Sequence, residues 1–451
     1  MNLNTISENT IFRKKLLKLV IPISMQQLMM ALVGVTDAVM LGFLSQDSLS
    51  AVSLAGQVQF VYSLFLFSIT GGVSIFASQY WGRRNKQAVE KILAIGLKIS
   101  VIISLLFTFG AVFAPVGLMK IFTSEAVLVD MGAEYLRTYA LSFLMLGISQ
   151  IYLCVMKNCG QAYKSSIISS VSVVINIVMN WLLIFGVGIF PKMGISGAAL
   201  ATVISKVVEL LWTLIIMLKK DNVKIRLSYI ISTDRVLKDD YFKYTLPIVG
   251  NELVWGLGFT MYSVIMGHLG SDAAAANSIA NIIKNLSVCV CMGIGSASGV
   301  IIGSELGRGN LEKAKKYGSK LCKISIIGGA ISGAVILCII PFIHLFSSLT
   351  STAQDYLKVM LIVSSYYVIG KSINTTTIAG IFPAGGDSKF GLKCDAFTMW
   401  AVVVPIGLIA AFVLKLSVPL VYIMINIDEI VKLPAVYHHY KKYHWLKNLT
   451  K

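Results

Sequence analysis

One carboxylate stands inside a long apolar stretch of the sequence. The segment VGVTDAVMLGFLS, residues 33–45, contains Asp37, and no Lys or Arg lies between Lys18 and Arg83. A lone carboxylate in hydrocarbon is costly unless it is neutralised or hydrogen-bonded, and intramembrane acids usually mark ion or proton pathways. We therefore interpret Asp37 as functional. The structural alternative is a protonated side chain that only joins helices through hydrogen bonds.

Three further oxygen-bearing side chains are expected near the depth of Asp37. Asn176 and Asn180 are four residues apart in INIVMNWLLIFG, so they share one helix face. Thr202 ends GISGAALAT in the following apolar segment. At 1.5 Å per residue, the four side chains lie about 9 to 16 Å from the outer ends of their segments. The set suits a hard cation such as Na⁺, and alternatively the low dielectric favours a proton on Asp37. We predict an ion-coupling site there and no structural metal.

These residues need a framework of membrane-spanning helices. The chain has 451 residues, of which 56% are hydrophobic and only 13% are charged, whereas about 25% is typical of soluble domains. Apolar segments of about 20 residues cross a bilayer as helices. Twelve spans are predicted: 18–43, 52–79, 92–114, 133–155, 165–187, 194–218, 243–268, 277–303, 321–343, 358–380, 392–414 and 416–433.

The net charge of +18 does not indicate a nucleic-acid-binding protein, because the basic residues follow the spans. With the N-terminus inside, most of the 39 Lys and Arg fall in inner loops. The outer loops receive Lys120, Lys192, Lys358 and Lys415. This bias obeys the positive-inside rule. We expect a multi-pass protein of the cell membrane with both termini in the cytoplasm.

The two halves of the chain repeat one pattern. One ungapped offset pairs Pro22 with Pro247, Asp47 with Asp272, and GRRN at 82–85 with GRGN at 307–310. Six spans return the chain to the same side, so the halves are expected to be related by an axis along the membrane normal. The predicted parts are an N-lobe at 1–218, a cytoplasmic loop at 219–242, and a C-lobe with a basic tail at 243–451.

Small residues recur every four positions in matching spans of the two halves. The stripes are Thr70, Ser74, Ser78 and Gly82 in span two, and Gly295, Gly299, Gly303 and Gly307 in span eight. Small residues let helices approach closely in a membrane. We interpret both stripes as structural.

Positions at which the halves differ are the better candidates for chemistry. Asp37 is paired with Tyr262, Gln59 with Lys284, and the Gln–Gln pair of the first half with an Asn–Glu pair. The predicted substrate-cavity residues are Gln26, Gln27, Asn251, Glu252, Tyr262 and Lys284. Glu252 would hold a cationic substrate or a second proton, or else bridge helices. Lys284 would contact an anionic group or exclude cations, or else snorkel outward.

Other charged groups receive a structural interpretation. Arg137, Lys206 and Lys371 are expected to snorkel at span ends. Asp428 and Glu429 are expected at the cytoplasmic end of span twelve, where water reaches them. The tail VYHHYKKYHW is interpreted as a solvated basic segment facing lipid head groups, with metal binding as the alternative.

At these residues the sequence resembles the multidrug and toxic compound extrusion (MATE) family. The motifs are PISMQQLMMALVGVTDAVMLGFLS and PIVGNELVWGLGFTMYSVIMGHLGSDAAAA, GRRN and GRGN, INIVMNWLLIFG with GISGAALAT, and FPAGGDSKFG. The resemblance covers nearly the whole chain. It implies an all-α protein with twelve transmembrane helices in two six-helix lobes. It also assigns ion coupling to Asp37, Asn176, Asn180 and Thr202.

The resemblance implies a secondary antiporter that exports small amphipathic or cationic compounds in exchange for Na⁺ or H⁺ by alternating access. No other cofactor is expected, and we expect a monomer in the lipid bilayer. Some family members place an acid at the position of Asn180, and others use an acid later in span seven and one in span ten. Here Glu252 comes earlier and span ten has no acid, which puts a second-lobe cation site in doubt.

Two rival functions remain open from the residues. The first is a flippase of lipid-linked or oligosaccharide substrates on a related architecture, although few cavity charges and twelve spans favour small amphipathic molecules. The second is an enzyme. VIGKS at 368–372 lacks the first glycine of a phosphate loop, and GIGSASG at 293–299 lacks the strand and spacing of a dinucleotide fingerprint. We therefore predict a protein that is not an enzyme.

Overall fold

The computed structural model describes residues 3–219, 222–232, 234–345 and 349–450, and no β-strand occurs in these ranges. Nine stretches of the described chain are helices long and apolar enough to cross a membrane. One of these stretches, Ala126–Phe185, is interrupted at 157–161 and contains two predicted spans. Two further helical stretches complete the set, the more polar one at predicted span 358–380 and a pair of short apolar helices at predicted span 416–433. The predicted all-α, twelve-span fold is confirmed.

The helices of the first half extend beyond most predicted spans because polar residues continue them outside the apolar stretch. Their bounds are α1 Leu3–Gly42, α2 Gln46–Gly82, α3 Lys86–Phe113, α4 Pro115–Lys120, α5 Ala126–Met156, the π-helical segment η1 Lys157–Gln161, α6 Ala162–Phe185, α7 Gly194–Leu218 and α8 Leu227–Ile231. Pro22 lies inside α1, where its ring removes one backbone hydrogen bond and favours a kink.

The second half begins with three long helices and then becomes more broken. The long helices are α9 Arg235–His268, α10 Ser271–Gly307 and α11 Leu311–Ile339. The remaining elements are η2 Ile340–Leu345, α12 Ser351–Asn374, η3 Thr375–Ile381, α13 Phe382–Ala384, α14 Lys389–Asp395, η4 Ala396–Val403, α15 Val404–Leu408, η5 Ile409–Val413, α16 Val418–Ile425, α17 Asp428–Val431 and α18 Leu433–Lys441. Predicted span twelve is therefore two short helices separated at 426–427.

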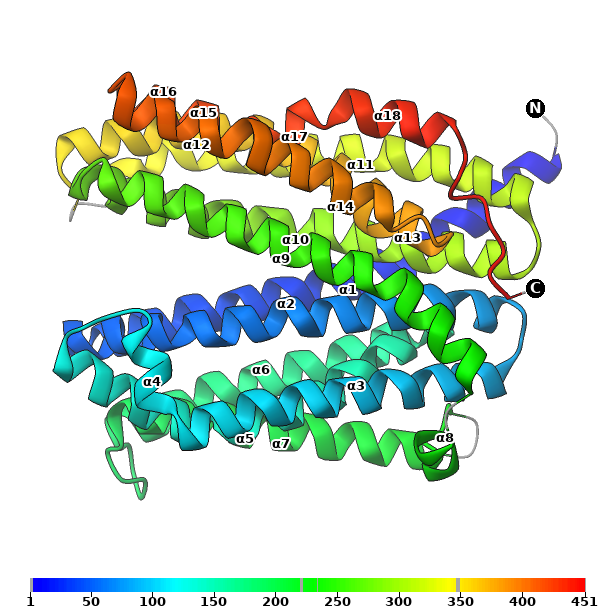
Figure 1. Ribbon diagram of the computed structural model, residues 1–451, viewed down its shortest axis with the longest axis horizontal. Coiled ribbons are helices and arrows are strands. Elements are labelled where there is room, and N and C mark those ends of the chain that lie inside the picture. Colours follow the sequence, from blue (N-terminus) through cyan, green and yellow to red (C-terminus); the bar gives the residue numbers. More distant parts are fainter. Residues whose placement is uncertain (1–2, 220–221, 233, 346–348, 451) are drawn as a thin grey trace. The chain divides into compact units, whose positions relative to one another are not determined.

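The helices form two compact units, coloured along the chain in Figure 1. The first-half unit comprises Met29–Ala77 and Asn85–Phe242, and the second-half unit comprises Met1–Leu28, Ser78–Arg84 and Lys243–Lys451. One end of α1 and one end of α2 thus belong to the second-half unit. The predicted lobe boundaries stay a prediction, and positions 220, 221 and 233 of the predicted connecting loop lie outside the described residues.

In the first-half unit, α3 packs on α5, and α5 and α6 both pack on α7. Polar groups between these helices are paired. The fully buried Tyr62 on α2 donates its hydroxyl proton to the Phe143 carbonyl oxygen at 2.8 Å and lies 2.9 Å from Ser104 Oγ. Because an unpaired buried hydroxyl is costly, these bonds fix how α2, α3 and α5 meet.

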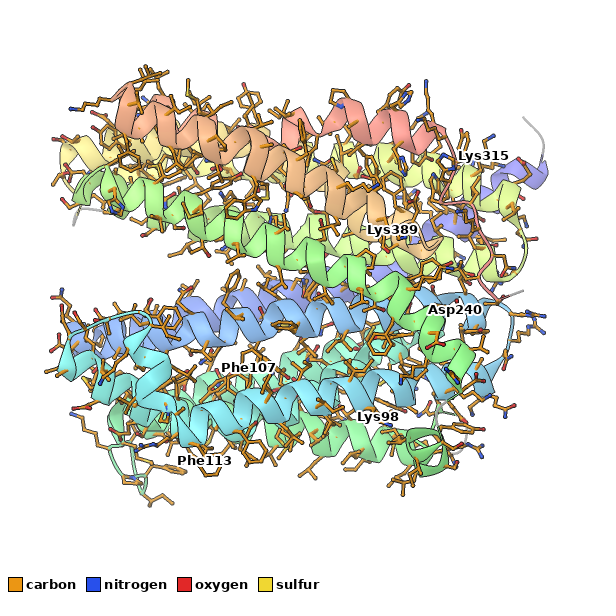
Figure 2. The ribbon with its side chains drawn as sticks, viewed as in Figure 1. Lys98, Phe107, Phe113, Asp240, Lys315 and Lys389 are labelled. Atoms are coloured by element: carbon orange, nitrogen blue, oxygen red, sulfur yellow. The ribbon has the colours of Figure 1, made fainter. Side chains whose placement is uncertain are left out.

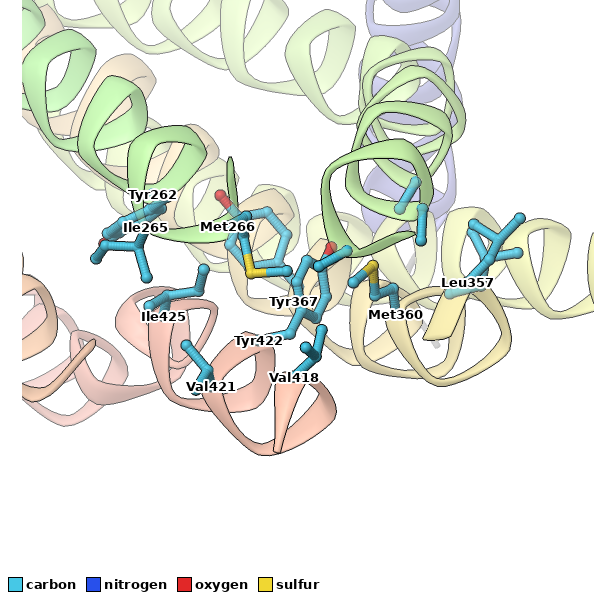
Figure 3. Close-up of a cluster of buried hydrophobic side chains, with 14 of the residues drawn as sticks. Tyr262, Ile265, Met266, Leu357, Met360, Tyr367, Val418, Val421, Tyr422 and Ile425 are labelled. Atoms are coloured by element: carbon cyan, nitrogen blue, oxygen red, sulfur yellow. The ribbon is translucent and has the colours of Figure 1, made fainter. Parts of the chain in front are cut away.

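The second-half unit has its own apolar core. α10 packs against α11, α12 and η3, and α12 packs against α16 and α17. Figure 3 shows side chains of α9, α12 and α16 meeting in one cluster. Its labelled members are Tyr262, Ile265, Met266, Leu357, Met360, Tyr367, Val418, Val421, Tyr422 and Ile425. The side chain of Tyr262, which was predicted to line the substrate cavity, is thus mostly buried in this core.

The small residues serve close helix packing, as predicted. A Cβ atom on Gly303 would lie 1.9 Å from Ser78 Oγ, and one on Gly307 would lie 1.9 Å from the Gln79 carbonyl oxygen. On the same helix, a Cβ on Gly295 would meet the Thr375 backbone at 3.0 Å. Only hydrogen fits at these contacts, so α10 lies directly against the end of α2 and against η3.

The turns after α2 and α10 confirm the repeat at the level of the backbone. Arg84 (φ 62°) and Gly309 (φ 79°) occupy the same place in GRRN and GRGN, and both adopt the left-handed conformation. Asn85 and Asn310 follow as N-caps, and the Asn85 side chain accepts a hydrogen bond from the Ala88 amide. Both turns end a long helix and start the next.

Large apolar side chains remain on the outside of the helices. Phe113, labelled in Figure 2, is 76% exposed, and Leu218 is 73% exposed. Many exposed residues of this kind on helices of spanning length indicate a surface covered by lipid rather than water.

The C-terminal tail is partly packed, whereas its His438, Lys441, Lys442 and His444 are exposed, as the interpretation as a solvated basic segment expects. Trp445 is fully buried and Val436 is 2% exposed. His439 Nε2 lies 2.7 Å from Asp387 Oδ2, and its ring stacks on Phe390. Beyond it, the Leu449 amide donates to Gln79 Oε1 at 2.8 Å. Because these partners come from the second-half unit, the tail is part of that unit's structure.

Candidate ion and substrate sites

The four predicted ion-coupling residues come from α1, α6 and α7 of the first-half unit. Asn180 Nδ2 donates to Asp37 Oδ1 at 2.5 Å and to Asn176 Oδ1 at 3.3 Å. Asn176 Nδ2 in turn donates to Thr202 Oγ1 at 3.1 Å. Asn176 and Asn180 stand one turn apart on α6, as their spacing predicts. The structure thus brings all four residues into one hydrogen-bonded chain.

The direction of these bonds defines what the site can bind. The side-chain amides of Asn180 and Asn176 both donate hydrogen bonds within this row of residues. The Asp37 carboxylate accepts one, as an ionised carboxylate does. Asn180 Oδ1 is buried and has no hydrogen-bond partner within the described residues. A buried acceptor without a donor is costly, and a cation would relieve it. Carboxylate, amide and hydroxyl oxygens together fit Na⁺.

Two tyrosines on α5 adjoin this site and were missed by sequence reasoning. Tyr135 and Tyr139 stack with ring centroids 5.8 Å apart, and both interact electrostatically with Asp37. Gln59 Nε2 donates to the Tyr135 hydroxyl at 3.1 Å. The spacing of four residues between the tyrosines was a usable signal, but nothing in the sequence places α5 beside α1.

The predicted substrate-cavity residues are distributed over α1, α9 and α10. Gln26 is 2% exposed on α1 and Gln27 is partly buried. In the second half, no hydrogen bond joins any two of the described side chains Asn251, Glu252 and Lys284. Glu252 and Lys284 instead interact electrostatically with a set of charged side chains from α12, α14 and α17. Their assignment to a cavity therefore stays a prediction.

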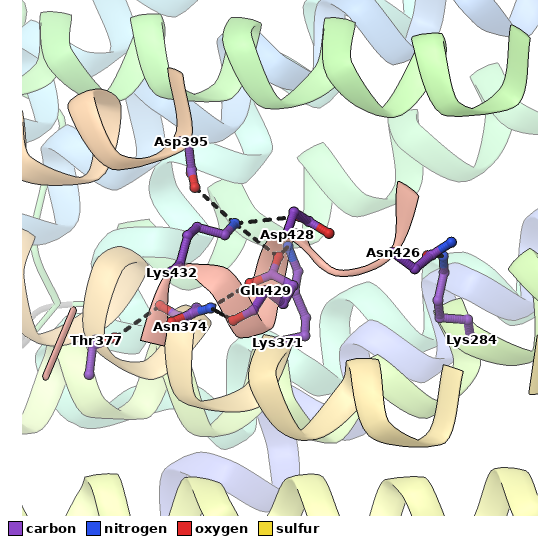
Figure 4. Close-up of polar contacts among 9 residues, drawn as sticks. All are labelled: Lys284, Lys371, Asn374, Thr377, Asp395, Asn426, Asp428, Glu429 and Lys432. Atoms are coloured by element: carbon purple, nitrogen blue, oxygen red, sulfur yellow. Dashed lines mark hydrogen bonds and ion pairs between the residues drawn. The ribbon is translucent and has the colours of Figure 1, made fainter. Parts of the chain in front are cut away.

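That set is a buried ion-pair network, shown in Figure 4. Lys432 Nζ lies 2.9 Å from Asp395 Oδ1, 3.3 Å from Glu429 Oε1 and 3.6 Å from Asp428 Oδ2. The expectation that water reaches Asp428 and Glu429 is wrong, because both side chains are 1% exposed. The break in span twelve is the reason, since it turns α17 so that its acids face α12 and α14.

The interpretation of two lysines as snorkelling residues is also corrected. Lys371 Nζ lies 3.1 Å from Glu429 Oε1, and Lys206 Nζ lies 3.0 Å from Glu209 Oε2. In both cases the acid is 1% exposed. The second half therefore contains buried acids although α12 itself has none in its inner part. The Lys371–Glu429 pair joins two helices, which a search of single spans does not find, whereas Lys206 and Glu209 are three residues apart on α7.

Lys284 is 5% exposed and does not reach outward. Its ammonium donates to Asn426 Oδ1 at 3.3 Å and lies 4.8 Å from the ring centroid of Tyr367. Amide and aromatic partners solvate a buried cation without neutralising it. Lys284 thus has amide and aromatic partners but no direct ion pair among the described residues.

Comparison with known proteins agrees with this architecture. The family model MatE matches residues 22–182 and 247–409, more than half of the chain. The chain therefore belongs to the MatE family, whose members are membrane transporters and not enzymes. The two matched segments begin at Pro22 and Pro247, the same residues that the internal repeat pairs.

Relatives and solved structures match over nearly the whole length. "Probable multidrug resistance protein YoeA" of Bacillus subtilis is 24% identical over 429 residues, which cover 91% of this chain and 89% of the relative. "Probable multidrug resistance protein NorM" of Mesorhizobium japonicum is 26% identical and covers 84% and 82%. A crystal structure of MATE in the straight conformation superposes with a TM-score of 0.87 at 21% identity, covering 96% of each chain. A MOP superfamily transporter from Pyrococcus furiosus gives 0.86, also at 21% identity and 96% of each chain. These two likenesses show the fold.

Proposed function

We propose that the protein is a secondary active antiporter that exports small amphipathic or cationic compounds, including drugs, in exchange for an inward-moving cation. Relatives bearing the name of multidrug resistance proteins support the export of drugs. Twelve spans with an internal repeat suit alternating access, and so does the packing of both chain ends in the same unit. We place the protein in the cell membrane, as a monomer with both termini in the cytoplasm.

The observation that carries the proposal is the Asp37 site. Asp37, Asn180, Asn176 and Thr202 form one chain of hydrogen bonds, with Asn180 Oδ1 left as a buried acceptor. Na⁺ would use this acceptor, whereas H⁺ would sit on the Asp37 carboxylate itself. The carboxylate, amide and hydroxyl oxygens of this site favour Na⁺, and H⁺ is the alternative coupling ion.

Coupling requires that the ion change the relative stability of two conformations. An ion at Asp37 would draw α1, α6 and α7 together, and we expect this to lower substrate affinity in the outward state. The membrane potential adds about 2.3 kcal/mol per charge per 100 mV to the driving force. Entry of one cation can therefore use the membrane potential to export a neutral substrate, whereas one-for-one exchange with a monocationic substrate moves no net charge and draws on the ion gradient alone.

The test is substrate efflux from proteoliposomes with Na⁺ and pH gradients imposed separately. We expect one gradient to drive efflux, and the Asp37→Asn variant to lose at least 90% of that efflux while passive exchange persists, because the amide carries no charge to balance a cation. Asp130→Asn, at an exposed position of α5, is the matched control. Gradient-driven efflux at the normal rate by Asp37→Asn would overturn the proposed coupling.

A further inference from the structure

One group of seven charged side chains in the second-half unit does not balance in charge. Four carboxylates and three ammonium groups interact electrostatically with one another across α9, α10, α12, α14, α17 and the following residue. They are Glu252, Asp395, Asp428 and Glu429, with Lys284, Lys371 and Lys432. When all are ionised, one negative charge remains. In a low-dielectric interior such a charge attracts one more cationic group.

Lys371 contacts one of these acids and an aromatic ring on the helix that carries another. Its ammonium is 3.1 Å from Glu429 Oε1. It also lies 4.8 Å from the ring centroid of Trp255 on α9. Trp255 is three residues after Glu252, so both side chains share one face of α9. Lys371 is also the cation that acts most strongly on the Glu252 carboxylate, although the two form no direct ion pair in the part of the chain described.

Glu429 does not depend on Lys371 alone. It also receives a hydrogen bond from Asn374 Nδ2 at 2.7 Å and lies 3.3 Å from Lys432 Nζ. Figure 4 shows these partners converging on the Glu429 carboxylate. If the Lys371 ammonium moves, Glu429 keeps a charged partner. Glu252 has no such reserve, and it is only partly buried, as is Trp255, so an external cation can approach both.

We propose that Lys371 is a tethered cation that occupies the position of the substrate's cationic group between Glu252 and Trp255 and thereby sets substrate affinity. An organic cation binds over the indole ring and beside Glu252, and the Lys371 ammonium turns fully to Glu429. The affinity for substrate is then set by a difference in binding free energy, between the substrate's cationic group and the Lys371 ammonium at this position. This inference rests on the proposed function for its biological use, but binding itself needs no ion gradient.

The test is equilibrium binding of ethidium, a fluorescent organic cation, to the purified full-length protein in detergent. Lys371→Gln removes the competing charge, so we expect ethidium to bind about tenfold more tightly than to the wild-type protein. Lys371→Arg keeps the charge and is expected to bind ethidium as the wild type does. The gain should disappear in Glu252→Gln/Lys371→Gln, because the acid that both cations share is gone.

A second variant serves as the control for effects on folding. Lys371→Gln/Glu429→Gln removes one positive and one negative charge together and is expected to show the same gain even where the single variant is unstable. The inference is overturned if monodisperse Lys371→Gln binds ethidium no more tightly, if the gain survives without Glu252, or if neither protein binds ethidium. Failure of Asp37-coupled efflux with the binding gain intact would instead count against the proposed antiport alone.

Discussion

At the scale of residues, the buried acids Asp37 and Glu429 are held by different means. Asp37 in the first half is held by the amide of Asn180, whereas Glu429 in the second half is held by Lys371 and Lys432. An amide leaves the negative charge in place, so a mobile cation can still bind. A lysine supplies the counter-charge from within the chain. This difference is why we assign the coupling ion to Asp37 rather than to Glu429.

The same comparison predicts a large structural role for Lys432. Its side chain is 2% exposed and it contacts three acids. Removing one partner of a buried ion pair leaves uncompensated charge, so Lys432→Met should lower the free energy of unfolding by about 3–5 kcal/mol. Thermal unfolding in detergent measures this loss. Lys389→Met, at an exposed position of α14, is the control, and equal melting temperatures for both variants would contradict the prediction.

At the scale of elements, backbone conformation rather than side-chain packing governs the turns that join long helices. Gly309 has φ of 79°, and a Cβ there would meet no atom within 4 Å. Gly309→Ala should therefore cost only the left-handed strain, roughly 1–2 kcal/mol. Gly267→Ala is the matched control, because it lies within α9 with equally open surroundings, and it should be neutral or slightly stabilising.

Melting temperatures of the two glycine variants, measured side by side, test this account of the turns. If Gly309→Ala unfolds at the same temperature as Gly267→Ala, the positive φ carries no strain. The equivalent Arg84 already adopts φ of 62°, which shows that one of the two turns accommodates a residue with a side chain in the left-handed conformation. The repeat in sequence is thus also a repeat in backbone geometry.

At the scale of the whole molecule, the distribution of charge predicts the orientation in the membrane. Most of the 39 Lys and Arg fall on the side that also holds the chain ends, and such loops stay in the cytoplasm. In a background with Cys338→Ser, a Lys238→Cys variant should react with an impermeant thiol reagent only after cells are opened. A Lys192→Cys variant should react in intact cells. The reverse pattern would contradict the predicted orientation.

The sequence alone determined the twelve spans and the repeat, and it predicted the four side chains that the structure joins by hydrogen bonds near Asp37. Each of these follows from local periodicity: apolar runs of spanning length, one constant offset, and Asn176 and Asn180 one helical turn apart. The MatE match supports the same spans and repeat. Local patterns are reliable here because a membrane forces every backbone group into a helix.

Only the tertiary structure decided which buried charges face each other. Lys371 on α12, Asp395 on α14 and the Glu429–Lys432 pair after the break in span twelve come from separate segments. Lys371 and Glu429, taken singly, are interpreted as residues near span ends. Their pairing depends on the packing of α12, α14 and α17, for which no local pattern exists. Electrostatic energy depends on distance in space, and helices far apart in sequence set that distance.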